Sequence, residues 1–184
     1  MGIRILGGSL KNRELLRKGI KKDFVRPTTA IVRKSIFDSI KDVKGFVVLD
    51  LFAGSGILGM EALSRGASKV IFIDKDRYLI NNLRENLKKF DLLERSFIYN
   101  TDFENAVRVL EEKDEKFDLI FVDPPYRLTN IYKPLKLLSE KNILKKDGFI
   151  VNLSYLSEVV DVGNFKIFKE KSFGITRILF LKEL

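Results

Sequence analysis

The sequence contains neither cysteine nor histidine among its 184 residues. The absence of cysteine excludes disulfide bonds and thiol nucleophiles, and the absence of both residue types removes the usual ligands of zinc. Histidine is also the commonest general base in enzymes. Any chemistry must therefore depend on carboxylates, hydroxyls, lysines, backbone groups or a bound cofactor, and we expect no metal site.

Long apolar runs are absent as well. No stretch approaches the roughly 20 apolar residues that cross a bilayer, and Met1 to Leu6 lack the apolar region of a signal peptide. Hydrophobic residues make up 45% and charged residues 32% of the chain, which is ordinary for a globular protein. We therefore expect a cytoplasmic, monomeric protein with one main core and no membrane contact.

The net charge of +9 is concentrated at the N-terminal end. Residues 1–45 hold twelve Lys or Arg against four Asp or Glu, whereas residues 46–184 hold twenty-two against twenty-one. Basic terminal segments are often only solvated, but a segment that binds a polyanion fits this asymmetry better. We therefore expect residues 1–45 to form a polyanion-binding appendage on a catalytic domain of residues 46–184.

Apolar runs alternate with amphipathic segments from residue 46 onward. Strands are expected over 46–51, 69–73, 96–99, 117–122 and 149–153, and helices over 57–65, 77–90, 103–112 and 130–141. This alternation predicts an α/β fold with a doubly wound, mostly parallel sheet. Two further strands over 165–169 and 175–182 have no helix between them and predict an antiparallel C-terminal hairpin.

The N-terminal appendage is predicted to be a small hairpin followed by a helix. The hairpin would pair 4–6 with 10–16 around Gly7-Gly8, and the helix would begin just beyond Pro27 with Thr28 or Thr29 as its cap. One apolar face of this helix is expected to pack on the main domain. It would consist of Ile31, Ile36, Phe37 and Ile40.

A glycine-rich turn follows the first strand of the catalytic domain. Asp50-Leu51-Phe52-Ala53-Gly54-Ser55-Gly56 leads directly into a helical pattern, so that a ligand can approach the backbone and the helix N-terminus. Gly59 completes a pattern that also fits dinucleotide-binding enzymes, so a dehydrogenase has to be considered. The negative charge of Asp50 would oppose a pyrophosphate and favour an ammonium or sulfonium group. This argument favours S-adenosylmethionine over NAD.

Carboxylates also follow the second and third strands. Asp74 is placed to accept hydrogen bonds from ribose hydroxyls, and Asp102 to face an adenine amine. Each of them taken singly could be an ordinary loop or cap residue, but open α/β sheets bind ligands at the edge where these strands end. The predicted cofactor-binding residues are Asp50, Phe52, Ala53, Gly54, Gly56, Asp74, Lys75, Asp102 and Phe103.

The fourth strand runs into Asp123-Pro124-Pro125-Tyr126, the predicted reaction centre. The two prolines stiffen the turn and remove two amide donors, which leaves nearby acceptors free. If the Asp123 carboxylate and the Pro124 carbonyl each accept one N–H of a base amine, its lone pair can be aimed at a sulfonium methyl group. Tyr126 would stack on the base. The alternative is a proline-stiffened loop without catalytic function.

The chain resembles the small-subunit ribosomal RNA guanine-N2 methyltransferases of bacteria over almost its whole length. The resemblance rests on the segments Arg4 to Lys11, Arg26 to Thr29 with Val32-Arg33 and Ile36-Phe37, Asp50 to Gly56, Glu61 to Ala67, and Asp123 to Tyr126. It implies a Rossmann-like fold, S-adenosylmethionine as cofactor, and a guanine amine of ribosomal RNA within a partly assembled small subunit as substrate. The chain departs from the family pattern at Asp74, where glutamate is more usual, and at Asn152 to Tyr155, where a more acidic loop is expected.

The basic appendage would accordingly contact RNA. Its candidate contacts are Arg4, Lys11, Arg26, Thr28 and Arg33. Two other functions stay open at this point: a DNA adenine or cytosine amino-methyltransferase with the same reaction centre, and a catalytically inactive RNA-binding protein with a methyltransferase fold. The DNA enzyme is disfavoured because such enzymes usually carry a larger target-recognition region than residues 1–45 provide.

Overall fold

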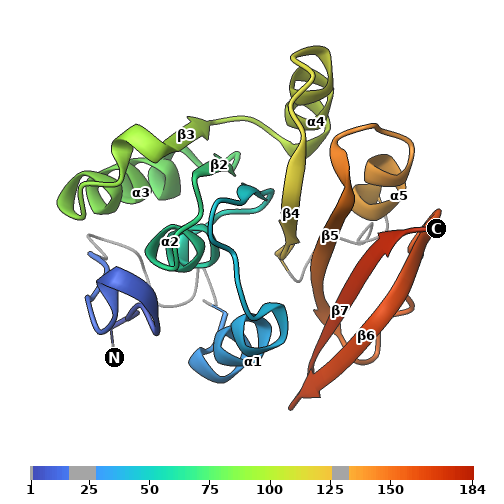
Figure 1. Cartoon of the computed structure of the whole chain (residues 1–184), viewed down its shortest axis with the longest axis horizontal. Helices are drawn as coiled ribbons and strands as arrows, with labels where there is room; N and C mark the ends of the chain where they lie inside the picture. Colours follow the sequence, from blue (N-terminus) through green and yellow to red (C-terminus); the bar gives the residue numbers. More distant parts are fainter. Residues whose placement is uncertain (1, 17–27, 126–132) are drawn as a thin grey trace.

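A computed structural model describes residues 2–16, 28–125 and 133–184 of the chain. Within these residues seven strands form one sheet in the order β3-β2-β1-β4-β5-β7-β6 (Figure 1). The strands are β1 (Val47–Asp50), β2 (Lys69–Ile73), β3 (Ser96–Tyr99), β4 (Phe117–Val122), β5 (Leu144–Tyr155), β6 (Phe165–Phe173) and β7 (Thr176–Glu183). Strands β1 to β5 pair in parallel, which confirms the predicted doubly wound α/β fold.

Helices cover both faces of this sheet. They are α1 (Ala30–Ile40), α2 (Ile57–Ser64), α3 (Arg77–Lys89), α4 (Phe103–Glu112) and α5 (Lys133–Ser139), with short 3-10 turns η1 (Gly8–Leu10) and η2 (Leu93–Arg95). Ile36, Met60 and Leu83 bring α1, α2 and α3 into one core, and Val107 and Leu138 bring α4 and α5 into the other. Burial on both faces explains why β1, β2 and β4 are mostly apolar, whereas the edge strand β3 is partly exposed. Among the described residues, no helix has the length and apolar character of a membrane span.

The C-terminal hairpin is present and longer than predicted. Strand β7 lies between β5 and β6 and runs antiparallel to both, so the hairpin closes the edge of the sheet opposite β3 (Figure 1). The fifth strand was expected to end at residue 153, but β5 continues to Tyr155 because Tyr155 still pairs with Thr176 of β7. Asn152 to Tyr155 are therefore strand residues, and the expectation of a loop at these four positions was wrong.

Helix α1 begins where the sequence predicted, and Thr29 is its N-cap, accepting a hydrogen bond from the Val32 amide at 3.4 Å. Ile36 and Phe37 are buried as expected, whereas Ile31 is 66% exposed. The inclusion of Ile31 in the packing face was wrong because the inward stripe consists of residues 32, 33, 36 and 37, at helical spacing. The stripe therefore contains a charged residue, Arg33.

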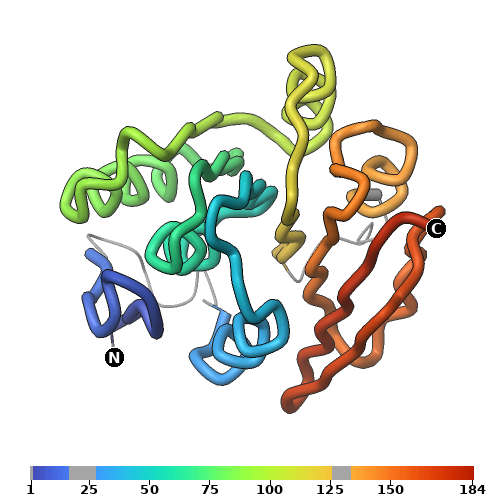
Figure 2. Tube along the Cα trace, viewed as in Figure 1, coloured from blue at the N-terminus to red at the C-terminus, as the bar shows by residue number. Residues whose placement is uncertain are grey.

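Residues 2–16 lie beside α2, where the Leu10 amide donates to the Ser64 hydroxyl (Figure 2). The predicted hairpin is reduced to a single bridge between Arg4 and Glu14 around η1. Ile3, Ile5 and Leu15 are buried in the same core as α1, α2 and α3. Ile3, Ile5 and Leu15 therefore share a core with residues beyond 45, and the division at residue 45 stays a prediction about charge and function.

Candidate active site

Three of the predicted acids lie at the carboxyl ends of neighbouring parallel strands. Asp50 ends β1, Asp74 follows β2 and Asp123 follows β4, and the sheet order places β1 between β2 and β4. The chain crosses from one side of the sheet to the other between β1 and β4, and open α/β sheets bind ligands at such a switch point. The acids are therefore gathered where a cofactor and a substrate can meet.

The acids at the ends of β1 and β2 hold the glycine-rich turn. The Gly59 amide donates to Asp50 Oδ2 at 3.0 Å, and the Gly54 amide donates to Asp74 Oδ2 at 2.7 Å. Gly56 caps α2 with a φ of 76°, in the left-handed region that favours glycine. A side chain at Gly59 would collide with the Phe72 ring, since a Cβ there would lie 2.2 Å from Phe72 Cε1. The glycines thus shape the turn and pack α2 against β2.

Burial perturbs the carboxyl groups of this edge. It raises the pKa of Asp50 to about 7; the hydrogen bond from Gly59 opposes this shift, and the charges of Asp123 and Asp74 add to it. Burial also raises the pKa of Asp74, against hydrogen bonds from the amides of Asp76 and Gly54. Near neutral pH the free protein therefore carries only a partial charge on Asp50. The expected full negative charge beside the turn is correspondingly weakened.

The remaining predicted cofactor residues surround the turn from two sides. The rings of Phe52 and Phe103 lie 5.5 Å apart between centroids, which joins the glycine-rich turn to the start of α4. Asp102 is the N-cap of α4 and accepts a hydrogen bond from the Asn105 amide at 2.8 Å, so it is held at this edge as a cap residue. Lys75 is exposed, and Ala53 is buried.

At the predicted reaction centre, the Thr28 hydroxyl donates to Asp123 Oδ2 at 2.5 Å. Burial raises the pKa of Asp123 to about 6, and this hydrogen bond lowers it. Pro124 is buried and Pro125 is exposed. Tyr126 lies outside the described residues, so its stacking role stays a prediction.

Asn152 was not predicted to be part of the site. It lies opposite Val122 in the strand beside β4, and its side-chain amide donates to the Val122 carbonyl at 3.2 Å. Its Oδ1 is buried and has no hydrogen-bond partner within the described part of the chain. No direct signal for this contact is present in the sequence, although Asn152 begins the segment that departs from the family pattern.

The predicted RNA contacts differ in their positions. Arg4 and Lys11 are exposed, with Arg4 in a surface ion pair with Glu14 at 3.1 Å. Arg26 lies outside the described residues. The Thr28 hydroxyl donates to the Asp123 carboxylate, and the role of Thr28 as an RNA contact stays a prediction.

Arg33 is only 4% exposed, and the prediction that it contacts RNA was wrong. Its Nε lies 3.6 Å from Glu61 Oε1, while Nη1 and Nη2 donate to the carbonyls of Thr28 and Arg4 at 2.6 and 2.8 Å. Burial lowers the pKa of Arg33, against the attraction of Glu61. A guanidinium with these internal partners is part of the core and cannot reach a phosphate at the surface.

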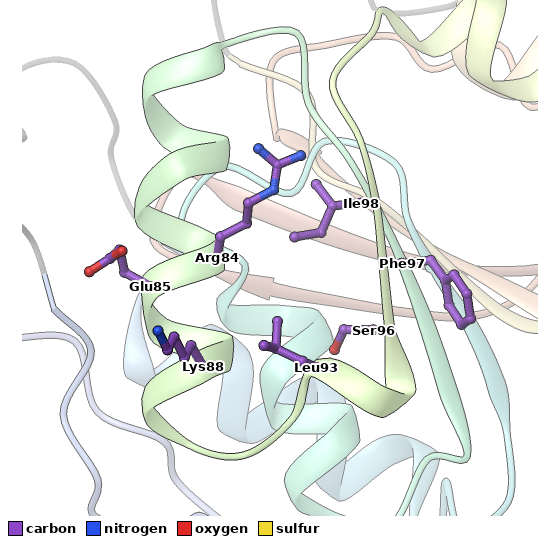
Figure 3. A pocket seen from close by; sticks show the side chains of 7 residues that line it. All are labelled: Arg84, Glu85, Lys88, Leu93, Ser96, Phe97 and Ile98. Atoms are coloured by element: carbon purple, nitrogen blue, oxygen red, sulfur yellow. The ribbon is translucent and has the colours of Figure 1, made fainter.

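A surface pocket of about 430 Å³ lies elsewhere, between α3 and β3 (Figure 3). Arg84 and Lys88 line it from α3, and Ser96 and Ile98 from β3. None of its lining residues belongs to the predicted site, and the pocket lies along the sheet edge formed by β3. We therefore do not assign the cofactor to it.

A family model and several known proteins match nearly the whole chain. The family model described as "Conserved hypothetical protein 95" matches residues 3–182. A Bacillus subtilis protein named "Putative rRNA methyltransferase YlbH" is 37% identical, over 98% of this chain and 99% of its own length. The Escherichia coli protein named "Ribosomal RNA small subunit methyltransferase D" is 32% identical, over 94% of this chain and 85% of its own length.

Solved structures with a similar fold have related descriptions. A structure described as "Putative methyltransferase yhhF from Escherichia coli" superposes with a TM-score of 0.84 at 29% identity, covering 100% of this chain and 98% of that one. A Streptococcus pyogenes structure described only as a conserved hypothetical protein reaches a TM-score of 0.74 at 32% identity, over 83% of this chain and 96% of that one. The chain therefore belongs to the Conserved hypothetical protein 95 family and is similar, over 94% of its residues, to the Escherichia coli protein named ribosomal RNA small subunit methyltransferase D.

Proposed function

We propose that the chain is an S-adenosylmethionine-dependent methyltransferase that acts on ribosomal RNA, with the exocyclic N2 amine of a guanine in the small subunit as the methyl acceptor. The observation that carries this proposal is the Asp123-Pro124-Pro125 turn, which lies at the same sheet edge as Asp50 and Asp74 in a chain whose relatives are named ribosomal RNA methyltransferases. The guanine N2 amine follows from the resemblance of the sequence to the guanine-N2 methyltransferases. We propose that the reaction takes place in the cytoplasm, on RNA within a partly assembled small subunit.

The residues at the carboxyl edge fit this cofactor. Gly54 and Gly56 adopt positive φ values of 53° and 76°, so the turn presents backbone without side chains to a ligand. Asp74 is partly exposed and has lone pairs left for ribose hydroxyls beyond its two amide contacts. The Phe52 and Phe103 rings provide an apolar wall for a purine. Bound there, S-adenosylmethionine supplies an electrophilic methyl group on a positively charged sulfur.

The chain's own residues prepare the acceptor amine. This amine is a poor nucleophile because its lone pair is delocalised into the base, so it needs acceptors that hold both N–H groups while the lone pair points at the methyl group. The Asp123 carboxylate and the Pro124 carbonyl are the proposed acceptors. A pKa of about 6 keeps Asp123 mostly ionised near neutral pH and able to take up the proton that the alkylated nitrogen loses.

Basic residues of the N-terminal segment are the proposed contacts with the RNA phosphates. Arg4 and Lys11 are exposed and lie on the segment that packs beside α2, and Arg26 completes the proposed set from its place in the sequence. Contacts of this kind neutralise phosphates without reading the sequence. Selection of the guanine would therefore fall to the reaction centre and the shape of the RNA.

The test is methyl transfer from labelled S-adenosylmethionine to small-subunit RNA, to the partly assembled subunit and to duplex DNA. We expect incorporation into RNA, with the assembled form methylated at least as well as the free RNA. Incorporation into DNA alone would support the DNA amino-methyltransferase. No incorporation into any acceptor would support the inactive RNA-binding protein. Thermal stabilisation by NAD and not by S-adenosylhomocysteine would indicate a dehydrogenase.

A further inference from the structure

The N-terminal segment reaches into the predicted reaction centre at one point. Thr28 precedes α1, yet its hydroxyl donates to Oδ2 of Asp123, which lies 95 residues later in the chain, at 2.5 Å. A hydrogen bond from a neutral hydroxyl to a carboxylate is a charge-assisted one and stronger than a bond between two neutral groups. The contact therefore fixes the orientation of the carboxylate that is proposed to accept the substrate amine.

We propose that Thr28 is a positioning residue of the methyl-transfer reaction, which holds the Asp123 carboxylate through Oδ2 and leaves Oδ1 free to accept an N–H of the guanine amine. This inference rests on the proposed function, and it assigns to the N-terminal segment a role in the reaction itself. A carboxylate that can rotate freely would have to be oriented in the transition state, and preorganisation avoids that cost. Without the hydroxyl, both oxygens of Asp123 would compete for the same amine.

Thr28 is itself held by a buried cation. Arg33 donates from Nη1 to the Thr28 carbonyl at 2.6 Å and is paired with the fully buried Glu61 of α2. The neighbouring Thr29 has a different contact, since its hydroxyl oxygen accepts a hydrogen bond from the Val32 amide as the cap of α1. The position of the hydroxyl is therefore set by α1 and α2, the helix that follows the glycine-rich turn. A positioning group needs this kind of support from rigid elements.

Charge around Asp123 gives the contact a second effect. Burial raises the pKa of Asp123, and the hydrogen bond from Thr28 lowers it. Asp50 on β1 interacts with Asp123 through its charge, and the Arg33 guanidinium donates to the Thr28 carbonyl. Among the described residues, Thr28 is the one side chain that donates a hydrogen bond to the Asp123 carboxylate. Its loss should therefore move the titration of Asp123 toward higher pH.

The experiment compares Thr28→Ala and Thr28→Ser with Thr29→Ala as a matched control. Turnover, its pH profile and the affinity for S-adenosylhomocysteine are measured for each variant, together with a melting curve. For Thr28→Ala we expect turnover to fall about 10- to 100-fold and its acid limb to move up by about 1 to 2 pH units, as expected for a lost hydrogen bond to a charged group. Thr28→Ser should stay within about threefold of wild type because it keeps the hydroxyl. Thr29→Ala should melt earlier through the loss of a helix cap but keep the wild-type pH profile.

A double variant separates positioning from general damage. In an Asp123→Ala background, Thr28→Ala should cause no further loss of turnover, because the group that it positions is gone. The inference is overturned if the two losses multiply, or if Thr28→Ala matches Thr29→Ala in turnover and acid limb. Absence of methyl transfer by the wild-type protein would instead contradict the proposed function, which keeps the two failures distinguishable.

Discussion

Replacing Glu61 by glutamine should destabilise the protein far more than the loss of an ordinary ion pair. Glu61 is fully buried, and its Oε1 lies 3.6 Å from Nε of the buried Arg33 and accepts a hydrogen bond from the Leu6 amide at 2.6 Å. Glutamine keeps an acceptor for that amide but removes the charge. The Arg33 guanidinium is then left in the core without a counter-charge, which costs about 3 to 5 kcal/mol.

The matched control is Glu115→Gln, which removes the Lys69–Glu115 ion pair at 2.6 Å. Both of its side chains are 27% exposed. A pair near the surface contributes about 0 to 1 kcal/mol. Because 1 kcal/mol shifts the melting temperature of a domain of this size by about 2 to 4 °C, Glu61→Gln should lower Tm by about 6 to 20 °C and the control by a few degrees at most. Urea unfolding supplies the free energies directly.

A second variant tests the cause of the loss. Adding Arg33→Met to Glu61→Gln removes the stranded charge and should recover part of the lost stability, although the hydrogen bonds to the carbonyls of Thr28 and Arg4 are not restored. Equal melting of Glu61→Gln and Glu115→Gln would refute the reasoning. The same result would mean that the Arg33 guanidinium does not need the charge of Glu61 as a buried counter-charge.

Four further outcomes are expected. Asp123→Ala should lower turnover at least about a hundredfold while the affinity for S-adenosylhomocysteine, measured by calorimetry, changes little. Asp74→Ala should weaken that affinity by about 1 to 3 kcal/mol, and an unchanged Kd would mean that another residue holds the ribose. Asp50→Asn should raise Tm at pH 8 but not at pH 4, because the raised pKa of Asp50 means that the folded state binds the proton more tightly and loses stability as the pH rises toward 7. Neutralising Lys11 and Arg26 should flatten the salt dependence of RNA binding by about 0.7 per lost contact, and slopes equal to wild type would show that their charge serves only solubility.

The sequence was sufficient for the sheet and for the edge at which the acids gather. Apolar runs of four to six residues between amphipathic segments define β1, β2 and β4, whose residues are mostly buried, whereas β3 is a partly exposed edge strand. The full length of β5 could not be predicted, since Leu144 pairs with Phe117 of β4 across a register shift and Tyr155 pairs with Thr176 of β7, a later part of the chain. Turn and cap chemistry placed the cap of α1 at Thr28 or Thr29, and the structure shows that it is Thr29.

The assignment of roles within the site was less predictable. Arg33 has the same appearance in the sequence as an exposed arginine, and only its distance to Glu61 reveals a core residue. Thr28 was recognised as part of a sequence motif. Its partner Asp123 follows β4, 95 residues later in the chain, and no local sequence pattern connects the two residues. Charge counting finds a basic segment and cannot distinguish its buried cations from its exposed ones.

The most direct test of the central claim is nucleoside analysis of small-subunit RNA after reaction with the wild-type protein and labelled S-adenosylmethionine. If Asp123 and Pro124 hold a guanine amine toward the methyl group, the label should appear as N2-methylguanosine at one position of the RNA, and Asp123→Ala should reduce it at least about a hundredfold. Label in another methylated nucleoside, or undiminished N2-methylguanosine from the Asp123→Ala variant, would contradict the account.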